Sequence, residues 1–165
     1  MEDFTTLYER HVLQVYGFFA YRLSSRETAE DLTQMTFERA LRAWERYDAR
    51  KASHATWLLA IARNLLIDFL RADKSSTQQD LEGEAQRLGV EVAHDLGLSP
   101  RLEQALGGLD ARSRELLALR YGADLTGPEI AEMTGLSLAN VQQILSRGLR
   151  RLRAELDGAE EQAAR

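Results

Sequence analysis

Three side chains on one predicted helix, Asn64, Asp68 and Arg71, have the types and spacing to contact a nucleic acid. At about 100° per residue they fall within an arc of roughly 60° and span about 10 Å along the helix axis. A guanidinium holds phosphate, and an amide offers a paired donor and acceptor to base edges. The alternative is a solvated polar face, which periodicity alone favours over contact with DNA.

A short polar connection, residues 48–55, precedes that helix. It carries Arg50 and Lys51, two cations that can approach a phosphate backbone. A charged loop is more often simply solvated, so that alternative stays open for both residues.

A second candidate surface lies at the start of the last predicted helix. Asn140, Gln142 and Gln143 stand at its N-terminal end, where a recognition helix meets base edges. Asn and Gln pair in bidentate fashion with adenine, and each good pair is worth about 1–3 kcal/mol of discrimination. An ordinary basic helix end that complements its own dipole is the alternative. The cations that would supply the salt-dependent phosphate contacts are Arg147, Arg150, Arg151 and Arg153.

The elements that position this second surface have helix-turn-helix spacing. The pattern predicts helices over residues 112–121, 128–134 and 138–156. Thr126 and Glu129 form a capping box around Pro128, Gly135 suits a left-handed stop, and Ser137 can cap the next helix. The apolar stripe expected to bury the last helix is Val141, Leu145, Leu149, Leu152 and Leu156.

Apolar residues at three- and four-residue steps predict three antiparallel helices in the first half of the chain. The first covers residues 4–23, and the third covers residues 56–71 with Trp57 assigned mainly to the core. Ser24 and Glu27 resemble a capping box that opens the second. We therefore predict an all-α fold of two small helical domains.

The middle of the chain differs in charge from both flanks. Residues 1–74 hold eleven basic and eleven acidic residues, residues 75–99 hold one against five, and residues 100–165 hold nine against ten. The formal net charge of −5 argues at first against a nucleic-acid partner, but the acidity lies mainly in this middle segment. We interpret residues 75–99 as an acidic, flexible linker and residues 159–165 as a flexible tail.

Composition excludes several classes of function. Without cysteine, the chain has no disulfide framework, thiolate metal site or cysteine nucleophile. His11, His54 and His94 lack helical ligand spacing, so no metal and no other cofactor is expected. No nucleophile–base set or phosphate loop is visible, so we expect no catalytic residue and no enzyme. No apolar run approaches the roughly 20 residues that span a bilayer, and no signal peptide is seen, so we expect a cytoplasmic protein without membrane insertion.

The order of these blocks resembles the extracytoplasmic-function group of bacterial RNA polymerase sigma factors. The resemblance implies a chain that binds core RNA polymerase, reads two elements of promoter DNA and helps to open it, with an anti-sigma factor as a further partner. Helix-turn-helix patterns alone are common, but this ordered pair of blocks is specific. The matching segments are Asp31–Ala40, Thr56–Trp57, Ile61–Asn64, Asp68–Arg71 and, after the linker, Leu109–Leu156.

The resemblance implies that residues 1–74 form sigma domain two and residues 100–158 form sigma domain four. A flipped base at the minus-ten element needs a hydrogen-bonding pocket. The implied contacts to core polymerase are Asp31, Gln34, Phe37 and Glu38, with core packing as the alternative for Phe37 and a solvated surface for the others. The implied minus-ten contacts are Arg50, Lys51, His54, Asn64, Asp68 and Arg71. The implied minus-thirty-five contacts are Ser137, Asn140, Gln142, Gln143, Arg147 and Arg150.

Several positions depart from the family's pattern, and each lowers positive charge or aromatic content. Gln142 and Ile144 stand where lysine and arginine are common, His54 stands where an aromatic residue is frequent, and the arginine run after the third helix is reduced to residues 71–74. A second hypothesis is therefore a sigma-like decoy that binds an anti-sigma factor without engaging DNA, although we expect no room here for the receiver domain of such decoys. A plain helix-turn-helix repressor would leave residues 31–71 unexplained.

Overall fold

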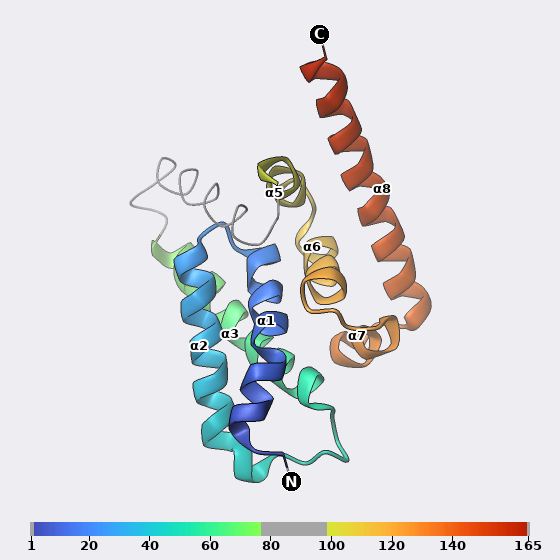
Figure 1. Cartoon of the computed structure of the whole chain (residues 1–165). Coiled ribbons are helices and arrows are strands. Elements are labelled where there is room, and N and C mark those ends of the chain that lie inside the picture. The colour runs from blue at the N-terminus through green and yellow to red at the C-terminus, as the bar shows by residue number, and fades with distance from the viewer. Residues whose placement is uncertain (1, 77–98, 165) are drawn as a thin grey trace.

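The computed structural model describes residues 2–76 and 99–164, and every regular element in these residues is helical (Figure 1). This confirms the predicted all-α fold with two helical halves. In chain order the elements are α1 (Phe4–Arg22), α2 (Arg26–Ala43), η1 (Trp44–Arg46), α3 (His54–Ser76), α5 (Pro100–Gly107), α6 (Ala111–Leu117), η2 (Ala118–Gly122), α7 (Gly127–Thr134) and α8 (Leu138–Ala163). Among the described helices, none is both long enough and apolar enough to cross a bilayer.

Helices α1, α2 and α3 pack against one another and form the first domain. The cap of α2 is Ser25, whose hydroxyl accepts a hydrogen bond from the Thr28 amide at 3.2 Å, so the predicted box of Ser24 and Glu27 is wrong by one residue. The reason is that Leu23 is buried, which holds the chain extended just after α1 and leaves Ser25 as the first residue able to cap.

Helix α3 is longer at both ends than residues 56–71. It begins at His54 because the Ser53 hydroxyl accepts from the Thr56 amide at 3.2 Å, which makes Ser53 the cap. It continues to Ser76, so the first two residues of the predicted linker are helical. The rest of that linker through residue 98, including His94, lies outside the described residues, while Ser99 caps α5.

The helix predicted over residues 112–121 is α6 followed by a π-helical turn, η2. In this turn the Ala123 amide donates to the Ala118 carbonyl at 2.9 Å, one residue farther back than in an α-helix. Helix α5 was not predicted, because its eight residues are too short to establish a period. Helix α8 continues to Ala163, through most of the segment that was predicted to be a flexible tail.

The helix-turn-helix is confirmed in its local details. Thr126 accepts from the Glu129 amide while the Glu129 carboxylate accepts from the Thr126 amide, which completes the capping box that opens α7. Gly135 ends α7 in the left-handed region at φ 75°, a conformation that glycine adopts without strain. Ser137 caps α8 by accepting from the Asn140 amide at 3.1 Å. These short-range signals set the angle at which α8 leaves the turn.

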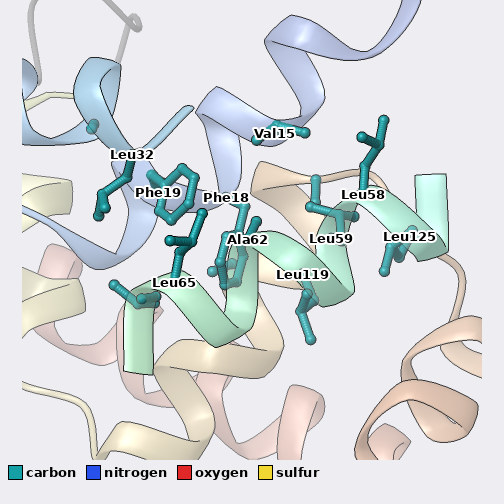
Figure 2. Close-up of a cluster of buried hydrophobic side chains, with 14 of the residues drawn as sticks. Val15, Phe18, Phe19, Leu32, Leu58, Leu59, Ala62, Leu65, Leu119 and Leu125 are labelled. Carbon is teal, nitrogen blue, oxygen red and sulfur yellow. The ribbon is translucent and has the colours of Figure 1, made fainter. Parts of the chain in front are cut away.

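One buried core runs through both halves of the chain (Figure 2). Phe18 on α1 and Leu58 on α3 belong to the same cluster as Leu119 on η2 and Leu125 just after it. The most extensive contact between two described elements joins α1 to η2. Fully burying one leucine is worth about 1.5–3 kcal/mol, so this shared cluster favours docking of the two domains. A second, smaller cluster joins α5, α6 and α8.

Candidate nucleic-acid interface

The three polar side chains predicted to share one side of α3, called the polar row below, form an exposed face of that helix. Asn64, Asp68 and Arg71 are all exposed, whereas Leu58 and Leu65 on the other side are buried. None of the three row side chains has a hydrogen bond or ion pair within the described part of the chain. Their amide, carboxylate and guanidinium groups are therefore all free to meet a ligand.

The loop between η1 and α3 is folded by its own charges. The Asp48 carboxylate accepts from the Arg50 amide, Nε and Nη2, each at 3.0 Å. These hydrogen bonds from Arg50 hold the pKa of Asp48 below its usual range. The Lys51 side chain is exposed, while its amide donates to the Asp48 carbonyl at 3.0 Å. Of the two predicted loop cations, Arg50 is thus held by Asp48 and Lys51 extends into solvent.

An aromatic cluster beside this loop was missed in the sequence. Tyr47 stacks on Trp44 at 5.7 Å between ring centroids and 4° between planes, and it lies 4.8 Å from Trp57. Its hydroxyl donates to the Ala52 carbonyl at 2.7 Å, across the loop. Burial raises the pKa of Tyr47. The feature of the sequence that could have revealed this cluster is the group of aromatic residues just before the polar loop.

His54 belongs to the same cluster rather than to a free surface. Its ring is 4.8 Å from that of Tyr47, and its Nδ1 lies 3.2 Å from a carboxylate oxygen of Glu2. The fold also brings His11 to 6.2 Å from His54, although the two are far apart in sequence. Among the described residues, no group of three or more histidine or acidic side chains is placed to hold a metal ion.

The start of α8 presents the predicted recognition residues to solvent. Asn140, Gln142, Gln143 and Arg147 are exposed, and their side chains have no partner within the described residues. At about 100° per residue, Asn140, Gln143 and Arg147 share one stripe, as does the exposed Arg150, whereas Gln142 lies about 160° around the helix from Asn140. One face of α8 therefore combines two amides for base edges with cations for phosphate.

A hollow between α6 and α8 extends this stripe. Its volume is about 390 Å³, and it is lined by Arg147 and Arg151 of α8 together with Arg112 and Ser113 of α6. Arg112 and Arg151 each lie near one glutamate, at 3.8 and 3.5 Å. The periodicity of α8 cannot reveal this site, because two of its residues come from another helix. Three guanidinium groups around one hollow suit a phosphate group.

The predicted polymerase-binding residues divide between surface and core. Asp31, Gln34 and Glu38 are exposed on α2, but Phe37 is 5% exposed and packs edge-on against Tyr8 at 4.8 Å, so the alternative of core packing is correct for it. Between α1 and α2 lies a groove of about 500 Å³. Its lining includes Gln34, Glu38 and the apolar residues Tyr8, Val12, Leu13 and Leu41.

Comparison with known proteins assigns both halves of the chain. Residues 7–76 match the family described as Sigma-70 region 2, and residues 105–154 match Sigma-70, region 4. The ECF RNA polymerase sigma factor SigM of Bacillus subtilis is 32% identical over 151 residues, which cover 90% of this chain and 91% of the relative. The ECF RNA polymerase sigma factor RpoE of Cereibacter sphaeroides is 30% identical over 158 residues, covering 93% and 86%.

Solved structures show the same fold. The sigma factor RpoE from Bartonella quintana, in complex with the anti-sigma factor NepR, matches with a TM-score of 0.74 at 20% identity over 95% of this chain and 98% of that one. CnrH, in complex with the cytosolic domain of CnrY, matches with a TM-score of 0.66 at 25% identity over 94% and 88%.

Proposed function

The chain belongs to the extracytoplasmic-function group of bacterial RNA polymerase sigma factors, and on that basis we propose which of its surfaces meets each partner. It binds core RNA polymerase and directs promoter recognition and melting in transcription initiation. We propose that polymerase supplies all of the chemistry, that this chain carries no active site, and that it works in the cytoplasm beside that polymerase. Residues 1–74 then act as sigma domain two and residues 100–158 as sigma domain four.

The observation that carries the proposal is the unpartnered stripe on α8 behind a capped helix-turn-helix. Asn140 and Gln143 read base edges of the minus-thirty-five element, and Arg147 and Arg150 hold the flanking phosphates. Gln142, on another side of the helix, contributes less, and Ser137 acts through its cap. The hollow beside Arg147 takes one further phosphate, with Arg112 as a contact from α6.

The phosphate contact of Arg112 has a direct test. Replacing Arg112→Gln should lower the slope of log affinity against log salt, measured on a minus-thirty-five duplex, by about 0.9, which corresponds to one phosphate. Arg39→Gln is the matched control, because it removes an equal charge from an exposed position of α2. Equal slopes for all three proteins would rule out the hollow as a phosphate site.

The minus-ten strand meets the row of Asn64, Asp68 and Arg71 and the loop before α3. Lys51 contacts phosphate directly, whereas Arg50 must first leave Asp48. His54 positions the loop through its contacts with Tyr47 and Glu2. This division assigns binding to the exposed side chains and loop geometry to the aromatic cluster.

The groove between α1 and α2 is the proposed docking surface for core polymerase. Leu13 is 78% exposed and Leu41 is 56% exposed, which is unusual for leucine, and both line this groove beside Gln34 and Glu38. A helix with an apolar stripe and basic flanks would bury these leucines and pair with Glu38 and nearby Asp31. We expect an anti-sigma factor to bind the chain as well, because the structurally similar RpoE was solved in complex with the anti-sigma factor NepR, and CnrH was likewise solved with a partner, the cytosolic domain of CnrY.

Reconstitution with core polymerase on a genomic promoter library tests the function as a whole. Transcription from a defined set of promoters is the expected result. A chain that fires no promoter but still binds a candidate anti-sigma protein would instead be a decoy.

The docking groove has its own test. Leu41→Asp should weaken polymerase binding at least tenfold, while binding to a minus-thirty-five duplex stays unchanged.

A further inference from the structure

A carboxylate ahead of α1 contacts the loop that is proposed to meet the minus-ten strand. The Glu2 Oε2 atom lies 3.2 Å from Nδ1 of His54, the first residue of α3. Its other oxygen, Oε1, lies 2.9 Å from Arg10 Nη1 on α1. Glu2 therefore bridges α1 and the start of α3, beside the connection that leads from η1 to α3 (Figure 1).

Two neighbouring residues fix the segment that carries Glu2. The Asp3 carboxylate caps α1 by accepting from the Thr6 amide at 2.7 Å, and this hydrogen bond lowers the pKa of Asp3. The Phe4 ring packs edge-on against Trp44, with 5.7 Å between ring centroids. Because Glu2 directly precedes these anchored residues, few positions are open to its side chain. Its carboxylate also lies near the N-terminal end of α3, where the helix dipole favours a negative charge.

His54 transmits this contact to the loop. Its ring lies 5.7 Å from that of Trp44 and packs on Tyr47, whose hydroxyl donates to the Ala52 carbonyl. A hydrocarbon ring could pack in the same way, but it would offer no N–H to the Glu2 carboxylate. The departure at position 54 from the aromatic residue that is frequent there thus comes with a partner for the added nitrogen.

Glu2 places a negative charge beside a surface that is proposed to bind a polyanion. By charge alone this carboxylate would weaken DNA binding, and its removal would strengthen it. By position it would strengthen binding, because it holds the ring on which the loop is packed. The side chains of Glu2 and His54 are only 19% and 24% exposed, so water and salt screen their contact less than that of an open surface pair. The two effects have opposite signs, and one substitution decides between them.

We propose that Glu2 is a positioning residue for the minus-ten strand. It fixes the ring of His54, and His54 with Tyr47 fixes the loop that presents Lys51 to phosphate. Glu2 itself does not contact DNA. This inference rests on the proposed minus-ten surface, and it adds the segment ahead of α1 to the elements that build that surface.

Strand binding by the full-length chain in complex with core polymerase gives the first test. The probe is a labelled single-stranded oligonucleotide carrying the minus-ten element of a promoter that the unaltered chain fires. We expect Glu2→Ala to raise the dissociation constant by about threefold or more. Glu9→Ala is the matched control, because it removes an equal charge from an exposed position of α1, and it should bind at least as tightly as the unaltered chain. Binding by Glu2→Ala that matches or exceeds that of Glu9→Ala would overturn the proposal.

A double-mutant cycle tests whether the effect passes through His54. His54→Phe keeps an aromatic ring and removes the nitrogen that faces Glu2. In that background Glu2→Ala should change the dissociation constant by less than about 1.5-fold. If Glu2→Ala weakens binding equally with and without the His54 nitrogen, the proposed route is wrong.

Tryptophan fluorescence reads the same contact without DNA. Both tryptophans of the chain, Trp44 and Trp57, lie in the aromatic cluster, with 6.1 Å between their ring centroids. Glu2→Ala should loosen the cluster and raise the acrylamide quenching constant by about half or more, while Glu9→Ala leaves it unchanged. Glu2→Gln, which keeps the shape of the side chain, should give a smaller change of the same sign. Circular dichroism checks that each variant is folded, and unchanged quenching in folded Glu2→Ala would also overturn the proposal.

Transcription separates failure of this proposal from failure of the function. If the unaltered chain fires no promoter with core polymerase, the sigma-factor function is refuted, and a role of Glu2 in strand binding is refuted with it. If the unaltered chain fires promoters while Glu2→Ala yields as much open complex as Glu9→Ala, the function stands and the positioning role does not.

Discussion

The loop before α3 and the start of α8 are two candidate DNA surfaces built in different ways. The loop is held by side-chain hydrogen bonds: the Tyr47 hydroxyl donates to the Ala52 carbonyl, and the Arg50 guanidinium donates to the Asp48 carboxylate. The stripe on α8 has no side-chain partners within the described residues, and only the cap at Ser137 and the helical repeat set its positions. The first surface therefore depends on supporting side chains such as Tyr47 and Asp48, whereas the second depends on the proposed contact residues themselves.

Tyr47→Ala should have the largest effect, because it removes a ring that contacts Trp44 and Trp57 as well as the hydroxyl that crosses the loop. We expect a loss of about 2–4 kcal/mol in unfolding free energy, measured by urea denaturation. Open-complex formation should fall while binding to a minus-thirty-five duplex persists. Tyr47→Phe, which loses only the hydrogen bond at about 1 kcal/mol, is its control. Equal loss of both DNA activities would remove the distinction between the surfaces.

Gln143→Ala, at the second surface, should weaken base discrimination while leaving stability almost unchanged. Discrimination at one base position should fall by about 1–3 kcal/mol, measured by competition among duplexes that differ at single positions. Stability should change by less than about 0.5 kcal/mol, because the side chain is exposed and unpartnered. Gln142→Ala, on another side of the helix, is the matched comparison and should alter discrimination less. An unchanged base preference in Gln143→Ala would contradict its assignment.

Thr126→Ala tests whether the second surface depends on anything beyond its own residues. It removes both side-chain roles of the capping box with Glu129, and we expect a loss of about 1 kcal/mol in unfolding free energy. Because Gly135 and Ser137 still direct α8, base preference at saturating protein should stay the same. A changed preference would mean that the cap of α7 helps to orient the reading face.

Asp48→Asn should have the smallest effect and the clearest dependence on pH. The folded pKa of Asp48 is lowered, so its stabilising contribution is present above the unfolded value near 3.8 and disappears as the pH falls through the folded value. Thermal midpoints of the variant and the unaltered chain should therefore differ slightly at pH 7 and converge once the pH lies below the lowered folded pKa. A difference that persists in acid would assign the effect to packing rather than to charge.

Structural features that are set by residues close together in the chain, such as helix caps and helix ends, were predictable from the sequence. Thr126, Gly135 and Ser137 each serve the role that their type and position indicated, and the exposed row on α3 lies where helical periodicity placed it. The cap of α2 was wrong by one residue, since burial of Leu23 decides between two adjacent serines. The roles of the individual contact residues remain predictions.

Contacts between distant segments were not predictable in the same way. Three contacts join segments whose own periodicity is unaffected by the contact: the approach of Gly17 to Gly122, the hollow shared by Arg112 and Arg147, and the aromatic cluster around Tyr47. Two helical domains were expected, but their common core was not, because an apolar stripe on a helix does not specify its partner.

The π-helical turn at residues 118–122 also has an evolutionary consequence. Such a turn is an α-helix with one additional residue. Deleting a single codon within it would restore a regular helix and rotate Gly122 by about 100° away from Gly17. Loss of the close contact between Gly17 and Gly122 would then require one in-frame deletion and no change in any residue proposed to read DNA. A single mutational step would therefore alter the packing of α1 on η2 while leaving both proposed DNA surfaces intact.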